Sequence, residues 1–300
     1  MKKTILLLVL LLFACGEQKD QVQVKGGVDK LKVISVNYPL HYFAQRIGGD
    51  VVDAQYPVAE KVDPAYWEPS TKEIVLYQEA DLILLNGAGY AKWVEKVSLP
   101  PSKLYNTSLP FKDNYVEINE GLTHSHGPGG EHEHKGYAFI TWLNFDNAII
   151  QAEEVYKALS NLLPESQQTF KSNYESLKNE LAELNQKMNT AATKFEGTTL
   201  FGSHPVYQYL SGGYNINIIS FHWEPDAMPD NFEWDRFKSL TKVNPSTIML
   251  WEDEPLPEVK QKIIDSGIKV VVFNPCGNKP ASGDFLSVMN QNIQSLKASK

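Results

Sequence analysis

The sequence predicts an α/β protein with two parallel-sheet lobes joined by one long helix and a ligand cleft between the lobes. Three observations support this fold class. Strand-like and helix-like segments alternate from residue 31 to residue 86, the alternation resumes after Gly197, and a long stretch with helical periodicity separates the two halves. Strands and helices that alternate at this spacing favour parallel sheets covered by helices. Ligands of such sheets bind beyond the carboxyl ends of the strands.

The first half supplies strand and helix signals in order. Short apolar runs predict three buried strands, at residues 31–36, 51–58 and 81–86. Helical spacing over residues 40–47 stops at Gly48, which is typical of a helix C-terminus. Ser70 and Glu73 have the spacing of a capping box, so a helix is expected from Ser70 to about residue 79.

The second half begins with the linking helix. Leucines and Phe170 recur every three or four positions over residues 164–194, and about 30 residues give roughly 45 Å of helix. Further strands are predicted at residues 198–202, 216–221, 247–251 and 269–273, and further helices at residues 232–240, 257–266 and 285–296. The predicted organisation is an N-terminal lobe over 31–163, a linking helix over 164–194 and a C-terminal lobe over 195–300.

Composition limits the classes of partner. The chain has 300 residues, 42% of them hydrophobic, so it can bury a core and is not a disordered or coiled-coil protein. Its 28 basic and 36 acidic residues give a net charge of −8. An acidic surface repels phosphate backbones, so nucleic acid is not expected as a partner. We expect a monomer.

The N-terminus has the features of an export signal. Two lysines precede an apolar run from Ile5 to Phe13 that is too short to span a bilayer, and Leu12-Phe13-Ala14-Cys15 resembles a bacterial lipobox. Residues 1–15 are therefore predicted to be a lipoprotein signal that ends at the anchor Cys15, and residues 16–30 a flexible tether. The predicted location is the bacterial cell envelope, periplasmic or at the cell surface, with membrane attachment through lipid alone.

A His-rich loop is predicted at residues 123–135. Its four histidines are His124, His126, His132 and His134. The glycines and Pro128 in the same segment disfavour a helix. Neutral imidazoles bind zinc, copper and nickel, so we expect this loop to capture a divalent metal weakly. Catalytic motifs such as Gly-x-Ser-x-Gly, His-Glu-x-x-His or a phosphate loop do not occur in the sequence, which favours a binding protein over an enzyme.

The chain resembles the solute-binding lipoproteins of zinc and manganese ABC importers from about Leu31 to Leu296. Short motifs distributed along the chain carry this resemblance: residues 37–40, 47–50, 62–64, 68–69, 80–82, 86–89, 142–143, 147–148, 202–204 and 270–275, with Trp93, Tyr207 and the His-rich loop. The resemblance implies two lobes with a metal between them, and an ABC permease and ATPase as partners.

The resemblance also implies which positions hold the metal. Family members use three histidines, or two and a carboxylate, and many add a late acidic residue. Of the four corresponding positions only the third keeps its histidine, His204, whereas the others carry Ala65, Ile140 and Asn274. Zinc needs about four donors, or three and a water, so these positions alone cannot complete a site.

Two ways of rebuilding a metal site stay open. In the first, loop histidines such as His132 or His134 fold into the cleft. In the second, His222 and Glu224, which share one side of an extended segment, act with the acidic run 252–254 or the thiolate of Cys276.

A third interpretation abandons metal. Four aromatic residues near the altered positions would then form a surface for an organic or cationic ligand: Tyr66, Trp67, Phe139 and Trp223. The leading hypothesis is an extracytoplasmic receptor that delivers zinc, ahead of manganese or copper, to an ABC importer. The alternative is a degenerate member that buffers metal through its loop, binds a non-metal ligand, or acts in adhesion.

Overall fold

The computed structural model describes residues 30–118, 123–125, 131–133 and 136–299. The predicted signal with Cys15, all but the last residue of the predicted tether, and the loop histidines His126 and His134 lie outside these residues. Within the described ranges, no helix combines the length and the apolar character that a membrane crossing requires.

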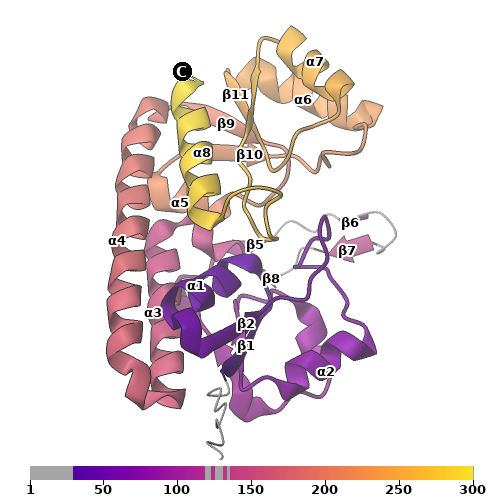
Figure 1. Cartoon of the computed structure of the whole chain (residues 1–300). Helices are drawn as coiled ribbons and strands as arrows, with labels where there is room; N and C mark the ends of the chain where they lie inside the picture. The colour runs from indigo at the N-terminus through magenta and orange to yellow at the C-terminus, as the bar shows by residue number, and fades with distance from the viewer. Residues whose placement is uncertain (1–29, 119–122, 126–130, 134–135, 300) are drawn as a thin grey trace, which may run out of the picture.

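Each lobe contains a four-stranded parallel sheet, which confirms the predicted fold class (Figure 1). The N-terminal sheet has the order β2-β1-β3-β4 and consists of β1 (Leu31–Ser35), β2 (Val52–Gln55), β3 (Leu82–Leu85) and β4 (Leu104–Asn106). The C-terminal sheet has the order β10-β9-β11-β12 and consists of β9 (Thr199–Gly202), β10 (Asn217–Ser220), β11 (Ile248–Trp251) and β12 (Lys269–Val272). The two sheets therefore share one topology.

The central strands explain why the sequence shows continuous apolar runs. All four residues of β11 are buried, and so are the first three of β3. Parallel sheets carry helices on both faces, so their strands lack the polar alternation of a half-exposed sheet.

Helices cover the sheets and connect the lobes. Their bounds are α1 (Tyr38–Gly48), α2 (Thr71–Glu79), α3 (Phe145–Leu162), α4 (Gln167–Ala192), α5 (Gln208–Tyr214), α6 (Asn231–Val243), α7 (Pro257–Asp265) and α8 (Phe285–Ala298). The expected capping box is present at α2, where the Glu73 carboxylate accepts the Ser70 N–H at 2.6 Å and the Ser70 hydroxyl accepts from the Glu73 N–H.

Two short antiparallel ladders occur in the insertion that carries the His-rich loop, and the second of them lies within the loop itself. Strand β5 (Glu117–Ile118) pairs with β8 (Gly136–Tyr137), and β6 (Thr123–Ser125) pairs with β7 (Glu131–Glu133). The second register places His124 opposite His132 along the backbone.

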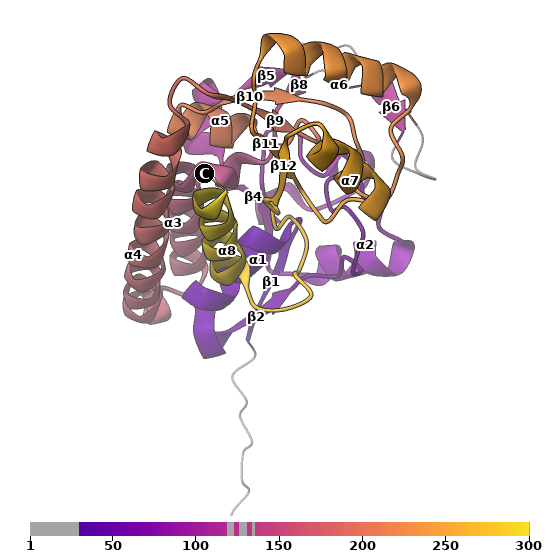
Figure 2. The ribbon, with the colours of Figure 1, turned by 90° about the horizontal axis from the view of Figure 1, so that it is seen from above.

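The predicted long helix is α4, which runs along the side of both lobes, and the shorter helix α3 packs beside it. The sequence analysis anticipated the region of α4, whereas α3 was missed. A three-residue turn at Pro164–Ser166 joins them, and the rings of Tyr156 and Tyr174 stack with centroids 5.3 Å apart. Figures 1 and 2 show α3, α4 and α8 gathered on the same side of the molecule.

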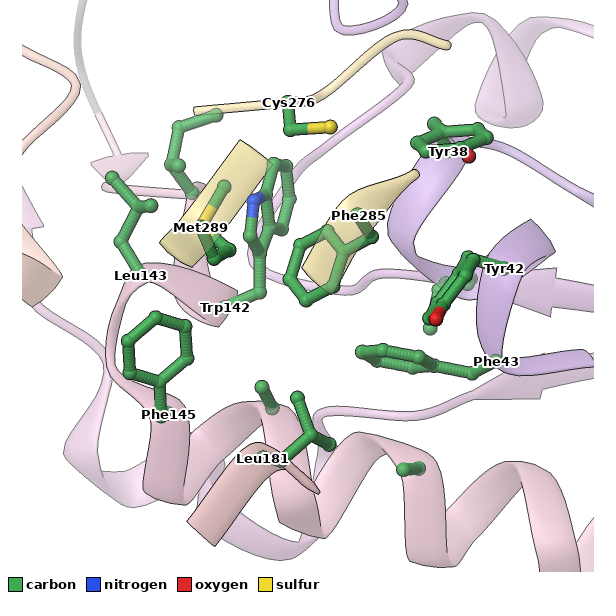
Figure 3. Packing of buried hydrophobic residues seen from close by; sticks show 14 of the residues in the cluster. Tyr38, Tyr42, Phe43, Trp142, Leu143, Phe145, Leu181, Cys276, Phe285 and Met289 are labelled. Carbon is green, nitrogen blue, oxygen red and sulfur yellow. The ribbon is translucent and has the colours of Figure 1, made fainter. Parts of the chain in front are cut away.

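One apolar core continues from the N-terminal lobe through these helices to the last helix. Figure 3 shows Phe43 of α1, Leu181 of α4 and Phe285 of α8 around Trp142. All four side chains are fully buried, and the rings of Phe43 and Phe285 meet edge to face at 5.5 Å. A smaller aromatic cluster fills the C-terminal lobe: Phe201, Phe221, Trp223, Trp234, Phe237 and Trp251.

The segment that leads from β12 to α8, residues 274–284, is bonded to the N-terminal lobe. The Asn278 side-chain amide donates to the carbonyls of Ala59 and Val62 at 2.8 and 2.7 Å. The Tyr38 N–H donates to the Gly277 carbonyl at 2.9 Å. A segment that follows a strand of one lobe is thus hydrogen-bonded to the other lobe, beside the pocket described next.

Candidate metal site between the lobes

Both sheets reverse their strand order at one point, and the carboxyl ends of the strands at such a point form the usual binding crevice of an open α/β sheet. In the N-terminal lobe, Asn37 follows β1 by two residues and Asn86 directly follows β3, and their buried side chains are joined by a 3.1 Å hydrogen bond. In the C-terminal lobe, His204 follows β9 and Glu252 follows β11. The neighbouring strand β10 leads to Glu224.

A pocket of about 550 Å³ lies between these strand ends. Its N-terminal wall is largely apolar and includes Tyr66, Tyr90, Ile118, Phe139 and Ile140. Its C-terminal wall is acidic around one imidazole and includes His204, Glu224, Asp226, Glu252 and Asp253. Asp63 adds a carboxylate from the N-terminal lobe, and Lys61 is the one basic residue among the described lining.

His204 occupies the centre of the acidic wall. It is 4% exposed, and its two ring nitrogens face different carboxylates. The Nε2 atom lies 3.5 Å from Glu224 Oε1, and the Nδ1 atom lies 3.7 Å from Glu252 Oε1. The ring of His222 approaches edge-on at 5.8 Å between centroids.

The distance from Nε2 to Glu224 matches that between two ligands of one tetrahedral zinc ion. Zinc bonds to nitrogen and oxygen of about 2.0–2.2 Å, at a tetrahedral angle, separate the two ligand atoms by about 3.4 Å. Glu252 faces the opposite ring nitrogen, where a carboxylate commonly orients a metal-bound histidine. The arrangement can therefore present the imidazole of His204 and the carboxylate of Glu224 to an ion, while Glu252 orients the imidazole through its Nδ1 atom.

Crowding of carboxylates shifts acid–base equilibria in the pocket. Burial, followed by the charges of Asp63, Glu224 and Asp253, raises the pKa of Glu252 to about 8. Burial, followed by the charges of Asp63, Glu224 and Glu252, raises the pKa of Tyr66, so its phenol stays neutral. A divalent cation in the pocket would offset this repulsion.

The family assignment follows from a match over nearly the whole described chain. The family model ZnuA, "Zinc-uptake complex component A periplasmic", matches residues 33–299. The chain belongs to the ZnuA family. This confirms the resemblance to zinc-type solute-binding proteins of ABC importers.

Curated relatives and a solved structure agree with this membership. The zinc-binding lipoprotein AdcA of Streptococcus pneumoniae is 25% identical over 99% of this chain, and the chain spans 61% of the length of AdcA. The high-affinity zinc uptake system protein ZnuA of Bacillus subtilis is 24% identical over 97% of this chain and 94% of the relative. The crystal structure of the metal-dependent lipoprotein YcdH from Bacillus subtilis shares the fold, with a TM-score of 0.77, 20% identity, and coverage of 90% of this chain and 99% of that chain.

At the three altered positions, this ZnuA-family chain has no metal-binding side chain directed at the pocket. Ile140 lines the pocket with an aliphatic side chain, and Ala65 is a buried methyl group. The side-chain oxygen of Asn274 accepts the N–H of Cys276 at 2.6 Å, so it is used in a local turn. Among the described residues, no group of three or more His, Cys, Asp or Glu side chains is arranged to hold a metal ion.

The structure brings only some of the proposed cleft residues to the pocket. Tyr66 and Phe139 line it, and so does Cys276. Trp67 does not, because its ring packs edge to face against Trp93 at 5.9 Å in the N-terminal core. Trp223 does not either: its ring lies in the C-terminal aromatic cluster, and its Nε1 donates to Glu233 at 2.9 Å.

Alternation after β10 accounts for the placement of Trp223. Backbone hydrogen bonds from Phe221 and Trp223 to residues 202 and 203 extend the pairing with β9. Successive side chains of an extended segment point to opposite sides, so Phe221 and Trp223 face the core while His222 and Glu224 face His204.

Sequence reasoning missed two contributors to the pocket, Asp63 and Tyr90. Asp63 lies in the 62–64 motif, where the sequence analysis considered only the neighbouring Ala65 as a ligand position. Its carboxylate accepts the Ala65 N–H at 2.9 Å and raises the pKa of Glu252. Tyr90 follows the 86–89 motif, and its ring meets Phe139 edge to face at 5.4 Å. In both cases, the adjacent family motif was the available signal.

Proposed function

We propose that this chain is the lipid-anchored, extracytoplasmic receptor of a zinc ABC importer, and that zinc binds in the pocket between the lobes. The observation that carries the proposal is the placement of Glu224 Oε1 3.5 Å from the Nε2 atom of the buried His204. Zinc-binding relatives and membership of the ZnuA family support zinc over manganese or copper.

In this proposal His204 and Glu224 are the ligands, and Glu252 orients the His204 ring. His222 lies close enough to His204 to join after a small movement of its ring. The loop histidines His124, His126, His132 and His134 collect zinc before it reaches the pocket.

The remaining parts of the proposal concern the whole protein. Cys15 carries the lipid, and residues 16–30 tether a monomeric domain to the envelope. The partners are an ABC permease and its ATPase, with no role for nucleic acid. The protein binds and delivers its ion without catalysing a reaction, and no feature of the described residues favours adhesion or buffering by the loop alone.

Zinc titration of variants tests the proposal. The protein is secreted with Cys15→Ser so that it is released without lipid, stripped of metal, and titrated with zinc against a chromophoric chelator. His204→Ala and Glu224→Gln each weaken binding at least tenfold, because each removes a ligand. Glu254→Gln is the matched control: Glu254 follows the site by two residues but pairs with Lys260 and does not line the pocket.

Deletion of residues 124–134 separates the two groups of histidines. The deletion slows zinc uptake but leaves one tightly bound ion per chain, as elemental analysis would show. If the His204→Ala variant binds zinc as tightly as the parent, the pocket is not the zinc site.

A further inference from the structure

A buried histidine of the N-terminal lobe has no part in the proposed function. His41 lies on α1 and is 9% exposed, and its Nδ1 atom is buried without a hydrogen-bond partner among the described residues. Its ring stacks on that of Tyr56 at 5.6 Å, and the ring of Tyr38 lies 6.0 Å away. A neutral imidazole donates through one nitrogen only, whereas an imidazolium has two N–H donors and would leave one of them unpaired at this position.

The two tyrosines beside His41 also hold the 274–284 segment. The Gly277 carbonyl accepts the Tyr38 N–H at 2.9 Å and the Tyr56 hydroxyl at 3.5 Å. The first five residues of the same segment line the pocket between the lobes. His41 therefore lies next to the point where one wall of the pocket is attached to the N-terminal lobe.

The charge that acts on His41 among the described residues is positive. Lys279 lies on the same segment, and its ammonium group is exposed. The neighbouring phenols are neutral, because burial raises the pKa of Tyr38 to about 12 and that of Tyr56 further. Burial also raises the pKa of Cys276 to about 12, so this side chain remains a thiol.

The other charged groups of α1 and of the segment are engaged elsewhere. The Asp284 carboxylate, at the end of the segment, accepts from the Tyr42 hydroxyl at 3.2 Å and from the Ser287 N–H at 2.9 Å. Arg46 of α1 donates two hydrogen bonds to Glu180 of α4, at 2.9 and 2.7 Å. These groups are satisfied without His41, so they do not supply a counter-charge to it.

These surroundings favour the neutral imidazole. Burial, and next the charge of Lys279, lower the pKa of His41 to about 4, and a backbone hydrogen bond to Gln55 opposes the shift. The Asp53 carboxylate of the neighbouring strand β2 accepts from the Gln55 side chain at 2.7 Å. A solvent-exposed histidine has a pKa of about 6.5. A form of the protein in which the segment is detached and His41 is exposed therefore binds the proton more tightly, so the attachment is intact above about pH 6.5 and weakens as the pH falls toward about 4.

We propose that His41 makes the attachment of the 274–284 segment sensitive to acid: protonation of its ring detaches the segment from the N-terminal lobe and opens one wall of the pocket. This inference concerns regulation of the pocket and holds whatever the pocket binds. The contacts that are lost are the hydrogen bonds from Tyr38 and Tyr56 to Gly277, because both tyrosine rings pack against His41.

Cys276 reports the detachment directly. In the Cys15→Ser chain it is the single thiol, it lies on the segment, and it is 2% exposed. Its rate of labelling by a dipyridyl disulfide, which reacts with thiols at acid pH, is divided by the rate for a short cysteine peptide at the same pH. Because the peptide corrects for the chemistry of the reagent, the ratio measures how often the segment detaches. We expect the ratio to rise roughly 100-fold from pH 7 to pH 4, as pKa values of about 6.5 and about 4 require.

Variants separate His41 from other acid-sensitive groups. His41→Phe keeps an aromatic ring on Tyr56 and His41→Gln keeps a polar side chain, but neither can be protonated, so both abolish the rise. Lys279→Gln raises the pKa of His41, so the rise levels off at a higher pH and is smaller. Lys92→Gln is the matched control, because Lys92 is an exposed lysine of the N-terminal lobe that does not act on His41. Circular dichroism verifies that each chain is folded at each pH.

Three results would overturn the inference. A ratio that stays constant from pH 7 to pH 4 means that acid does not detach the segment. A rise that persists in both His41 variants assigns the effect to other groups. A ratio that increases steeply with low concentrations of urea shows that labelling requires global unfolding, because local detachment exposes little surface. The proposed function stands in each case, since zinc titration at neutral pH tests it separately.

Discussion

At the scale of single residues, His204 gains its properties from what faces each ring nitrogen. An exposed histidine near two glutamates would exchange contacts freely, whereas a side chain that is 4% exposed keeps one orientation. Glu252, which directly follows β11, faces Nδ1, whereas Glu224, four residues after β10, faces Nε2. The partner of its side chain also makes Asn274, two residues after β12, a poor candidate for a metal ligand. Its side-chain oxygen accepts a hydrogen bond from the backbone N–H of Cys276.

Cys276 offers a residue-level prediction about reactivity. Burial raises the pKa of its thiol to about 12, and the side chain is 2% exposed. Because the thiolate is the nucleophile, only about 10⁻⁴ of the thiol is reactive at pH 8. In the Cys15→Ser chain, we expect a thiol reagent to label Cys276 far more slowly in buffer than in denaturant. The rate in buffer should rise about tenfold per pH unit from pH 8 to pH 10.

The denatured chain serves as the control for that measurement, since its thiol has an ordinary pKa. Stoichiometric labelling of the native protein at pH 8, as fast as that of free cysteine, would show that Cys276 is exposed and ionised. It would then become a candidate zinc ligand.

Site residues could be predicted from sequence where a local pattern decides orientation. Alternation from residue 221 to 224 was enough to place His222 and Glu224 on one side, and the same rule would have assigned Trp223 to the core. The proximity of His204 and Glu252 could not be predicted from the sequence, because it depends on β9 and β11 being neighbours in the sheet. The contribution of Asp63 depends in the same way on how the two lobes approach each other.

At the scale of elements, the predicted strands and most helices were found because their signals are local. Apolar runs give the buried strands, and a capping box fixes the start of α2. The missed helix α3 carried a readable signal, since the side chain of Asn144 caps it by accepting the Asp146 N–H at 3.0 Å. Strand β4 has three half-buried residues, too few for any periodicity to stand out.

The 274–284 segment provides a prediction for one element. The Asn278 amide bonds two carbonyls of the loop that leads to Asp63. Asn278→Ala should lower the free energy of unfolding by about 1–2 kcal/mol, because two hydrogen bonds are lost from a half-buried site. It should also weaken zinc binding, since the loop that carries Asp63 becomes less fixed. Urea unfolding and zinc titration measure the two effects.

Asn179→Ala is the control for this prediction, because Asn179 is exposed on α4 and far from the segment in sequence. Unchanged zinc affinity in Asn278→Ala, despite lower stability, would mean that the segment supports the fold but not the pocket.

At the scale of the whole molecule, the continuous core determines how the chain unfolds. Leu181 of α4 is fully buried between α1, α3 and α8, so its contacts belong to neither lobe alone. Leu181→Ala should cost about 2–5 kcal/mol, the usual range for a cavity of this kind. The protein should still melt in one transition, at lower temperature, when followed by calorimetry.

Glu175→Ala, at an exposed position of the same helix, should leave the melting temperature nearly unchanged. Two separate transitions in either variant would contradict a shared core and indicate lobes that unfold independently.

The common strand order of the two sheets gives the molecule an approximate internal repeat, in which β1 and β3 correspond to β9 and β11. Equivalent positions at the strand ends then hold an amide pair in one half, Asn37 with Asn86, and an ionisable pair in the other, His204 with Glu252. The strand-end pair of the first half is neutral, and its two side chains are hydrogen-bonded to each other. The strand-end pair of the second half is ionisable and lines the pocket. Redesign of the ligand preference should therefore begin with substitutions at His204 and Glu252, because these change the side chains that line the pocket and leave the Asn37–Asn86 hydrogen bond intact.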